Sequence, residues 1–194
     1  MTEQEDQLLS VLDAISLNSR ASQRDLSRAT GLNLAKVNYL LRKLTEKGYV
    51  KLRNVSRNPN KLGYLYLLTP HGLTEKSRLT VRFAARTWRE YSRTIEMLRA
   101  SLARLAESGD RRIALVGANE VTDMIIEAAT KIKEIDIVCI VEPARAGERR
   151  AEVPVVADMR GIGFDRAILC LDREPGATEM AIRAGIDKER LWHV

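Results

Sequence analysis

The chain is poor in the residues that build disulfides, metal sites and catalytic centres. Only two cysteines and two histidines occur among its 194 residues. Cys139 and Cys170 both lie within apolar runs, so we expect buried, reduced thiols rather than a disulfide or a metal pair. His71 stands at an expected helix start and His193 far from it, and no nucleophile–base pair or metal cluster is evident. The sequence therefore predicts a protein that is not an enzyme.

Long apolar runs are also missing. No run approaches the roughly 18 residues that a membrane span requires, and residues 1–6 are polar and acidic. We therefore expect no membrane span, no signal peptide and a cytoplasmic location. The hydrophobic fraction of 45% is ordinary for a globular protein, and the length suits two small domains that each bury a core.

Positive charge is concentrated in one part of the chain. The net charge is +6, but residues 1–108 hold 19 Lys and Arg against 10 Asp and Glu, and residues 109–194 hold 13 against 16. Within 20–61 the count is 11 basic to 2 acidic residues. This distribution predicts a polyanionic partner for the N-terminal region alone, the alternative being a merely solvated basic face.

The first 68 residues have the pattern of a winged helix-turn-helix. Capping boxes begin at Thr2 and Ser22, and Asn33 is placed to cap a third helix after the turn at Gly31. Gly48 ends that helix, and an alternating segment, a polar turn at 56–61 and a second alternating segment follow. The expected elements are helices at 3–17, between Ser22 and Gly31, and at 34–47, then strands at 49–55 and 63–68.

The helix at 34–47 would enter the major groove of double-stranded DNA. Arg and Lys can donate to guanine, and Asn can pair with adenine. Backbone amides at the start of the preceding helix can reach phosphate, and the wing tip suits phosphate or minor-groove contact. A winged helix used only for protein contacts is the alternative. The predicted DNA-contacting residues are Ser22, Gln23, Lys36, Asn38, Tyr39, Arg42, Lys43, Arg57, Asn58 and Lys61.

A single long helix is expected over 70–108, because Pro70 suits a first helical position and no further proline follows before Glu107. Apolar side chains within it recur at alternating steps of four and three, the spacing of a coiled-coil seam. We therefore expect a homodimer through residues 81–105, the alternative being a helix packed along its own C-terminal domain. The seam residues are Ala84, Trp88, Tyr91, Ile95, Leu98, Leu102 and Leu105.

Residues 109–194 have the pattern of a small parallel sheet covered on both faces, because short apolar runs alternate with helical segments. Ligands of such sheets bind at the carboxyl ends of the strands, where a helix starting near Asn119 offers free amides to a phosphate. The expected elements are strands at 113–116, 137–141, 153–157, 165–171 and 190–194 and helices at 119–133 and 176–185. The candidate ligand-binding residues are Gly117, Asn119, Glu120, Glu142, Asp172 and Arg173.

The glycine fingerprint of dinucleotide-binding domains is incomplete here. Gly117 is kept, but Asn119 and Thr122 stand where G-x-G-x-x-G has its other glycines. Asn119 would hinder the approach of a pyrophosphate, and Thr122 would loosen the contact between helix and strand. The pattern therefore argues against a dinucleotide such as NAD. Glu142 lies near the place of a ribose-binding carboxylate.

Two family resemblances extend these expectations. The runs GLNLAKVNYLLRKLTEKGYVKL and NPNKLGYLYLLTPHGLTEKSRLT resemble the MarR-type winged helix, in the branch associated with exopolysaccharide synthesis, over about residues 5–95. This resemblance implies a homodimer on a palindromic operator. MarR dimers usually close with helices at both chain ends around a ligand crevice. This chain continues into an α/β domain instead, so the sensing of an effector is expected there.

The C-terminal runs IALVGANEVTDMIIEAA, IDIVCIVEP, VPVVADMRGI and FDRAILCLDRE are similar to a second family. It comprises the small Rossmann-like domains that precede polysaccharide-biosynthesis dehydratases and sugar acetyltransferases. This resemblance covers about residues 112–194 and implies a nucleotide or nucleotide-sugar ligand. The chain departs from the family at Asn119, where a glycine is usual, and at Glu142-Pro143, where an acidic pair is common. An α/β dimerisation module without a ligand is the alternative.

Together these features predict an α/β plus α+β protein. A winged helix-turn-helix at 1–69 is followed by a long linking helix at 70–108 and a small Rossmann-like parallel-sheet domain at 109–194. The predicted function is that of a dimeric transcriptional regulator that binds double-stranded DNA and responds to a small-molecule effector.

Overall fold

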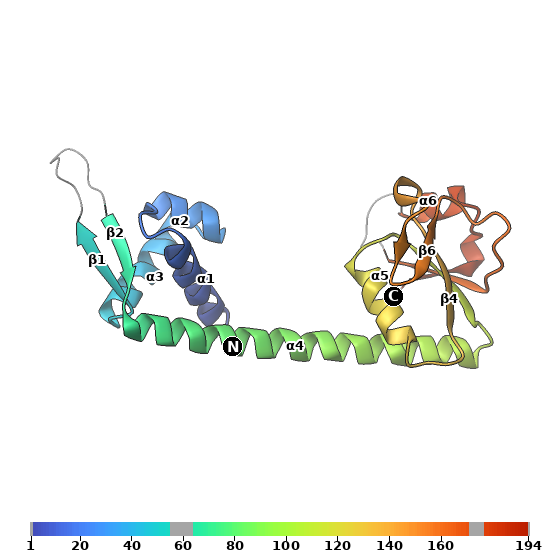
Figure 1. Cartoon of the computed structure of the whole chain (residues 1–194), viewed down its shortest axis with the longest axis horizontal. Coiled ribbons are helices and arrows are strands. Elements are labelled where there is room, and N and C mark those ends of the chain that lie inside the picture. The colour runs from blue at the N-terminus through green and yellow to red at the C-terminus, as the bar shows by residue number, and fades with distance from the viewer. Residues whose placement is uncertain (1, 55–63, 171–176, 194) are drawn as a thin grey trace. The chain divides into compact units, whose positions relative to one another are not determined.

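The computed structural model describes residues 2–54, 64–170 and 177–193. The fold divides into two compact units, Met1–Arg89 and Glu90–Val194, and the boundary falls within one helix, α4 (Pro70–Glu107) (Figure 1). The expected division into three segments, at 69/70 and 108/109, stays a prediction. No helix in these ranges is both long and apolar enough to cross a membrane.

The N-terminal unit has the predicted order of three helices and a hairpin. Thr2 and Ser22 form capping boxes, and the Asn33 side chain accepts a hydrogen bond from the Lys36 amide at 2.8 Å. These local caps explain why the helix starts could be predicted. The elements are α1 (Glu3–Leu17), α2 (Gln23–Thr30), α3 (Leu34–Glu46), β1 (Val50–Asn54), β2 (Tyr64–Leu68) and the first part of α4.

One apolar core joins all these elements. Leu12 from α1, Leu26 from α2, Leu40 and Leu44 from α3, and Leu79 from α4 are almost fully buried together. The antiparallel pair β1–β2 adds Val50 and Tyr66 to this core. The first turns of α4 are therefore part of the winged-helix unit.

The start of α4 is fixed against the junction between α3 and β1. The Thr69 hydroxyl donates to the Gly48 carbonyl at 2.6 Å and accepts from the Gly72 amide at 2.9 Å. A Cβ atom at Gly72 would lie 2.0 Å from the Tyr49 carbonyl oxygen, so only glycine fits there. This contact accounts for the Thr-Pro-His-Gly sequence at the strand-to-helix transition.

The C-terminal unit contains a mixed sheet in the order β5-β6-β4-β3-β7-β8. Neighbouring strands are parallel except for β5, which runs antiparallel to β6. The elements are β3 (Arg112–Val116), α5 (Glu120–Ala129), β4 (Asp136–Val141), η1 (Pro143–Arg145), β5 (Arg149–Arg150), β6 (Val153–Val156), β7 (Arg166–Leu169), α6 (Ala177–Arg183), η2 (Lys188–Arg190) and β8 (Leu191–His193).

The sheet differs from the expected one at β5, which was not predicted. This strand has two residues and turns into β6 through Ala151 and Glu152, both with positive φ. Such turns normally contain Gly, Asn or Asp, so the sequence carries no signal for this one. The expected helix at 119–133 was also too long, because α5 ends at Ala129 and Ile132 belongs to a turn closed on the Ala129 carbonyl.

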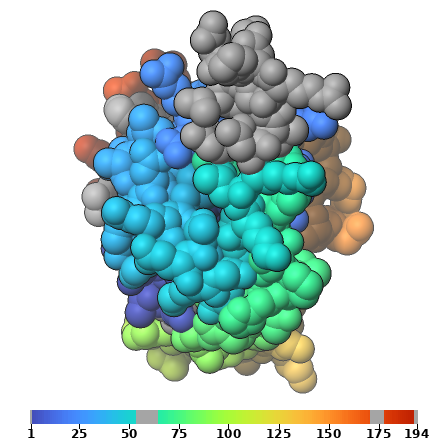
Figure 2. Space-filling view, turned by 90° about the vertical axis from the view of Figure 1, so that its left-hand side faces the viewer, coloured from blue at the N-terminus to red at the C-terminus, as the bar shows by residue number. Residues whose placement is uncertain are grey.

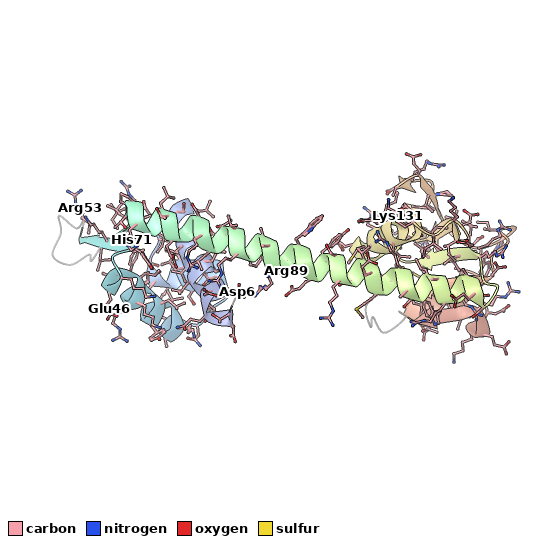
Figure 3. All side chains as sticks on the ribbon, turned by 90° about the horizontal axis from the view of Figure 1, so that it is seen from below. Asp6, Glu46, Arg53, His71, Arg89 and Lys131 are labelled. Carbon is pink, nitrogen blue, oxygen red and sulfur yellow. The ribbon has the colours of Figure 1, made fainter. Side chains whose placement is uncertain are left out.

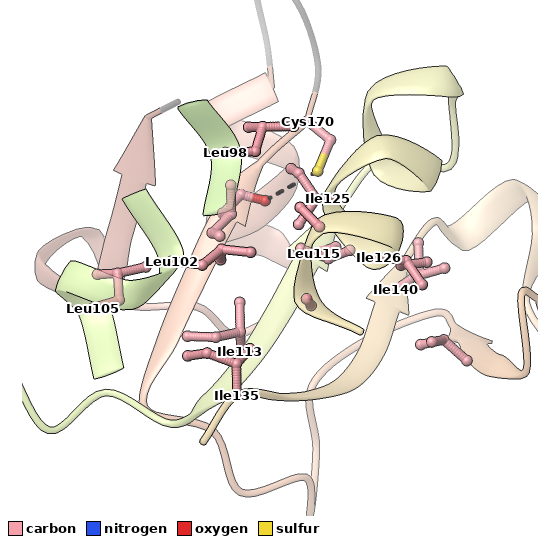
Figure 4. Close-up of a cluster of buried hydrophobic side chains, with 14 of the residues drawn as sticks. Leu98, Leu102, Leu105, Ile113, Leu115, Ile125, Ile126, Ile135, Ile140 and Cys170 are labelled. Carbon is pink, nitrogen blue, oxygen red and sulfur yellow. Dashed lines mark hydrogen bonds between the residues drawn. The ribbon is translucent and has the colours of Figure 1, made fainter. Parts of the chain in front are cut away.

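The sheet is buried on both faces, as predicted. Leu115 and Ile140 pack on one face with α5 and the last turns of α4 (Figure 4), and Val116 and Val141 pack on the other face with α6. Both cysteines are free and buried, in agreement with the prediction of buried thiols. Burial raises the pKa of the Cys139 and Cys170 thiols to about 11.

The expected dimer seam over 81–105 is wrong for its second half. Ile95, Leu98, Leu102 and Leu105 are buried in the core of the C-terminal unit itself (Figure 4). A coiled-coil seam between two chains and a helix packed on the sheet of its own chain both require apolar residues at steps of four and three. The spacing alone therefore could not distinguish the two arrangements. Trp88, by contrast, is 68% exposed.

Candidate functional site

The α3 helix presents the five predicted DNA-contacting residues on the side away from its core. Val37, Leu40, Leu41 and Leu44 are buried, whereas Asn38, Tyr39 and Arg42 are exposed and Lys36 and Lys43 are half-buried. Figure 2 shows α3 and β1, in light blue and cyan, as one continuous surface of the N-terminal unit.

Three of these residues form one cluster. The Lys43 ammonium lies 5.0 Å, and the Lys36 ammonium 5.8 Å, from the centre of the Tyr39 ring. The hydrogen bond with Lys43 lowers the pKa of the Tyr39 hydroxyl. Cation–π attraction therefore holds two positive charges and an aromatic ring together at the surface.

The structure corrects one expectation at the start of α2. The Ser22 amide donates to Asp25 Oδ2 at 2.9 Å, and the Ser22 hydroxyl donates to the same oxygen at 2.7 Å. These bonds lower the pKa of the Asp25 carboxyl, which also holds Arg28. The Ser22 amide is thus already engaged within the chain, whereas Gln23 is exposed. Contact of either residue with DNA stays a prediction.

The wing contributes cations that were not among the predicted contacts. Lys51 and Arg53 are exposed and pair with Leu67 and Leu65, so they lie on the outer face of the hairpin. Arg53 points away from the unit in Figure 3. Both residues stand two positions apart in β1 and therefore on one side of it, so the alternating pattern of this segment could have identified them. The predicted wing-tip residues Arg57, Asn58 and Lys61 lie outside the described residues.

The geometry so far is that of a helix-turn-helix followed by a basic hairpin. Residues 4–51 match the family model described as winged helix-turn-helix DNA-binding. The N-terminal unit therefore contains a winged helix of the DNA-binding type. No curated protein matches the chain.

Several solved structures of transcriptional regulators are similar to part of this chain. The PcaV regulator from Streptomyces coelicolor in complex with its natural ligand is 21% identical, with a TM-score of 0.40, over 57% of this chain and 77% of that one. A MarR/EmrR family regulator from Acinetobacter sp. ADP1 is 24% identical, with a TM-score of 0.39, over 56% and 72%. The S. aureus MepR–DNA complex is 20% identical, with a TM-score of 0.38, over 56% and 78%. Likeness at this level does not extend to function.

In the C-terminal unit, the carboxyl ends of the strands bring several predicted ligand-binding residues together. The Gly117 amide donates to the Val141 carbonyl at 3.0 Å, directly before Glu142. The Asn119 side chain donates to the Cys170 carbonyl at 2.7 Å. Glu120 is exposed at the start of α5. Asp172 and Arg173 lie outside the described residues.

The expected free amides at the start of α5 are occupied. Asn119 Oδ1 accepts from the amides of Val121 at 3.0 Å and Thr122 at 3.2 Å. Thr122 is completely buried and its hydroxyl donates to the Gly117 carbonyl, so it ties helix to strand rather than loosening the contact. The Asn119 side chain thus occupies two amides that a phosphate at this helix start would use.

Two arginines that sequence reasoning missed cover the same loop. Arg145 and Arg150 both donate to the Ala118 carbonyl, at 3.2 and 3.1 Å. Arg150 also forms two hydrogen bonds with Asp123 and thereby lowers the pKa of that carboxyl. Arg145 lies 3.6 Å from Glu148. Both positive charges are therefore balanced by neighbouring carboxylates.

Proposed function

We propose that the chain is a sequence-specific transcriptional regulator that binds double-stranded DNA as a homodimer. Its C-terminal unit would sense a nucleotide or nucleotide-sugar metabolite, and genes of polysaccharide synthesis are the expected target. The observation that carries the DNA-binding part is the coincidence of the winged helix with the exposed basic surface of α3 and β1. In this arrangement Asn38 and Arg42 contact bases, and the wing contacts the phosphate backbone.

The dimer is proposed to form through a shorter stretch of α4 than expected from sequence. Val81, Ala84, Ala85 and Trp88 follow one another at helical spacing and are all exposed. The stripe combines the large side chain of Trp88 with small alanine side chains. The alanines leave space for the Trp88 side chain of a second copy. The stripe can therefore complement its own copy across a twofold axis.

The sensing role is supported by the topology of the C-terminal unit. Apart from β5, the strand order is β6-β4-β3-β7-β8, which is the order of doubly wound, Rossmann-like sheets. The occupied amides at α5 favour a second candidate, a C-terminal unit that serves only as a dimerisation or protein-interaction module without a ligand.

The DNA-binding proposal can be tested on full-length variants with selected operator DNA. We expect Arg42→Ala to reduce specificity by about 1–3 kcal/mol, because it removes a donor to a base edge. Lys51→Ala should weaken binding to all sequences alike and reduce the salt slope by about 1. The measurement is fluorescence anisotropy with operator and scrambled duplexes at several salt concentrations.

Arg160→Ala is the matched control, since its side chain is 91% exposed and belongs to the C-terminal unit. It should leave both readouts unchanged. Retention of specificity by Arg42→Ala and of the salt slope by Lys51→Ala would contradict the assignment of α3 and the wing.

A further inference from the structure

The first turn of α3 carries two exposed apolar residues. Leu34 is 40% exposed at the first position of the helix, and Ala35, directly after it, is exposed as well. Leu32, just before the helix, packs against the core of the N-terminal unit. Leu34 and Ala35 remain at the surface, and neither was among the predicted DNA-contacting residues. The core therefore does not account for these two side chains.

Both residues lie on the side of α3 that the predicted base contacts occupy. Seven residues make about two helical turns, so Ala35 lies in line with Arg42, which is exposed. Leu34 lies one turn before Asn38, which is exposed too. The Asn33 side chain caps this turn at 2.8 Å from the Lys36 amide, so the turn is regular without an external partner. A groove that meets Asn38 and Arg42 therefore also meets Leu34 and Ala35.

The charges of α3 favour an approach of DNA to its first turn. The only acidic residue of the helix, Glu46, stands in the last turn and offsets the charge of Lys43 three positions earlier. The first turn contains no acidic residue, and the positive end of the helix dipole lies there. In helix-turn-helix proteins the N-terminal residues of the recognition helix contact base edges. Leu34 and Ala35 are therefore placed at base edges rather than at the phosphate backbone.

We propose that Leu34 and Ala35 recognise thymine in the operator through contact with its C5-methyl group. The inference rests on the proposed DNA-binding function and names a base that this surface selects. In the major groove, the thymine methyl group offers an apolar contact among the donors and acceptors of the base edges. An apolar side chain against the amino group of cytosine or adenine would leave that donor without a partner. Two apolar residues at this place therefore favour thymine.

The helix also sets the place of this thymine relative to the other contacts. The turn from Leu34 to Asn38 spans about 6 Å along α3, which equals about two base pairs at about 3.4 Å each. Arg42 lies one further turn along the helix. For a helix that lies along the groove, each half-site should therefore present thymine, adenine and guanine in that order, about two base pairs apart.

The test is the replacement of thymine by deoxyuridine, which removes only the methyl group. The full chain first selects its operator from random duplexes, and each thymine of one half-site is then replaced in turn. Fluorescence anisotropy at a fixed salt concentration measures the affinity. We expect a loss of about fourfold at one or two adjacent positions, the factor that corresponds to the burial of one methyl group. Replacement of the other thymines should leave the affinity unchanged.

Variants of α3 connect this effect to the two side chains. Leu34→Ala and Ala35→Ser should each weaken operator binding and reduce the difference between thymine and uracil to less than twofold. Both residues are exposed, so the unfolding transition should remain in place. Leu17→Ala is the matched control, because Leu17 is 89% exposed at the end of α1, outside α3. It should keep the full difference between thymine and uracil.

The proposal is overturned if the selected half-site contains no thymine, or if deoxyuridine at every thymine leaves the affinity within twofold. It is also overturned if both α3 variants keep the difference between thymine and uracil. In each of these cases the operator is still bound, so only the thymine contact of Leu34 and Ala35 is contradicted. Selection of no operator by the full chain would contradict the proposed function and, with it, this inference.

Discussion

At the scale of single residues, Gly72 has the strictest requirement in the N-terminal unit. A Cβ atom there would lie 2.0 Å from a backbone oxygen of Tyr49, which cannot move aside as a side chain could. We expect Gly72→Ala to lower the free energy of unfolding by about 3 kcal/mol, at the upper end of overpacking effects. Urea denaturation followed by circular dichroism measures the loss.

The control for Gly72 is Gly31→Ala. Gly31 has a φ of +69° and open space around it, so this variant carries only the cost of the left-handed conformation, about 1 kcal/mol. Equal losses in the two variants would show that the close approach at Tyr49 contributes nothing.

The Asp165 carboxyl is held by two backbone hydrogen bonds. Its Oδ2 accepts from the amides of Arg112 and Arg111, each at 2.8 Å, and these bonds lower the pKa of the carboxyl. A pKa that is lower in the folded state than in the unfolded one stabilises the fold above the unfolded value of about 4. That contribution is lost as the pH falls through the folded value.

We therefore expect Asp165→Asn to lower the free energy of unfolding at pH 7 by about 1 kcal/mol. The expected loss is small because Asp165 is exposed and water screens its interactions. The difference from the unmodified chain should shrink as the pH falls below about 4. Urea denaturation at pH 7, 5 and 3 measures it, with Glu152→Gln as the exposed control. A difference that stays constant between pH 7 and pH 3 would count against this account.

At the scale of elements, the N-terminal unit could be predicted because its signals are local. Ser22 and Asn33 cap helices within three residues of themselves, and the buried residues of α3 recur at helical spacing. Secondary structure set by neighbours along the chain can be identified from a single sequence.

The β5 strand and the role of Asn119 at the start of α5 could not be predicted, because both depend on residues distant in sequence. Arg150 in β5 is held by Asp123, 27 positions earlier. Asn119 donates to the Cys170 carbonyl, 51 positions later. An asparagine at the start of a helix suits either a cap or an open ligand loop, and only its distant partner shows which one applies.

At the scale of the whole molecule, α4 is one helix with two kinds of surroundings. Leu79 belongs to the core of the N-terminal unit, and Leu102 belongs to the core of the C-terminal unit. Between them, residues 80–90 are exposed with the exception of Arg86, which is half-buried and holds Asp6 of α1. The apolar side chains of α4 are thus buried in one core, exposed, or buried in the other core, according to their position along the helix.

These surroundings predict different consequences for two substitutions in α4. Leu102→Ala should lower the free energy of unfolding by about 3 kcal/mol, because it leaves a cavity at a position only 1% exposed. Trp88→Ala should change it by less than about 0.5 kcal/mol but weaken self-association at least tenfold. Urea denaturation at low protein concentration and sedimentation equilibrium measure the two effects. Unchanged self-association in Trp88→Ala would rule out this stripe as the dimer surface.

The bonds between Thr69, Gly72 and the end of α3 have a mechanical consequence. The Thr69 hydroxyl holds the Gly48 carbonyl, and Gly72 lies against Tyr49 without a gap. Gly48 and Tyr49 directly follow the last turn of α3. The first turn of α4 therefore cannot slide or rotate without carrying the end of α3 with it. A force applied along α4 would therefore be transmitted directly to the C-terminal end of α3.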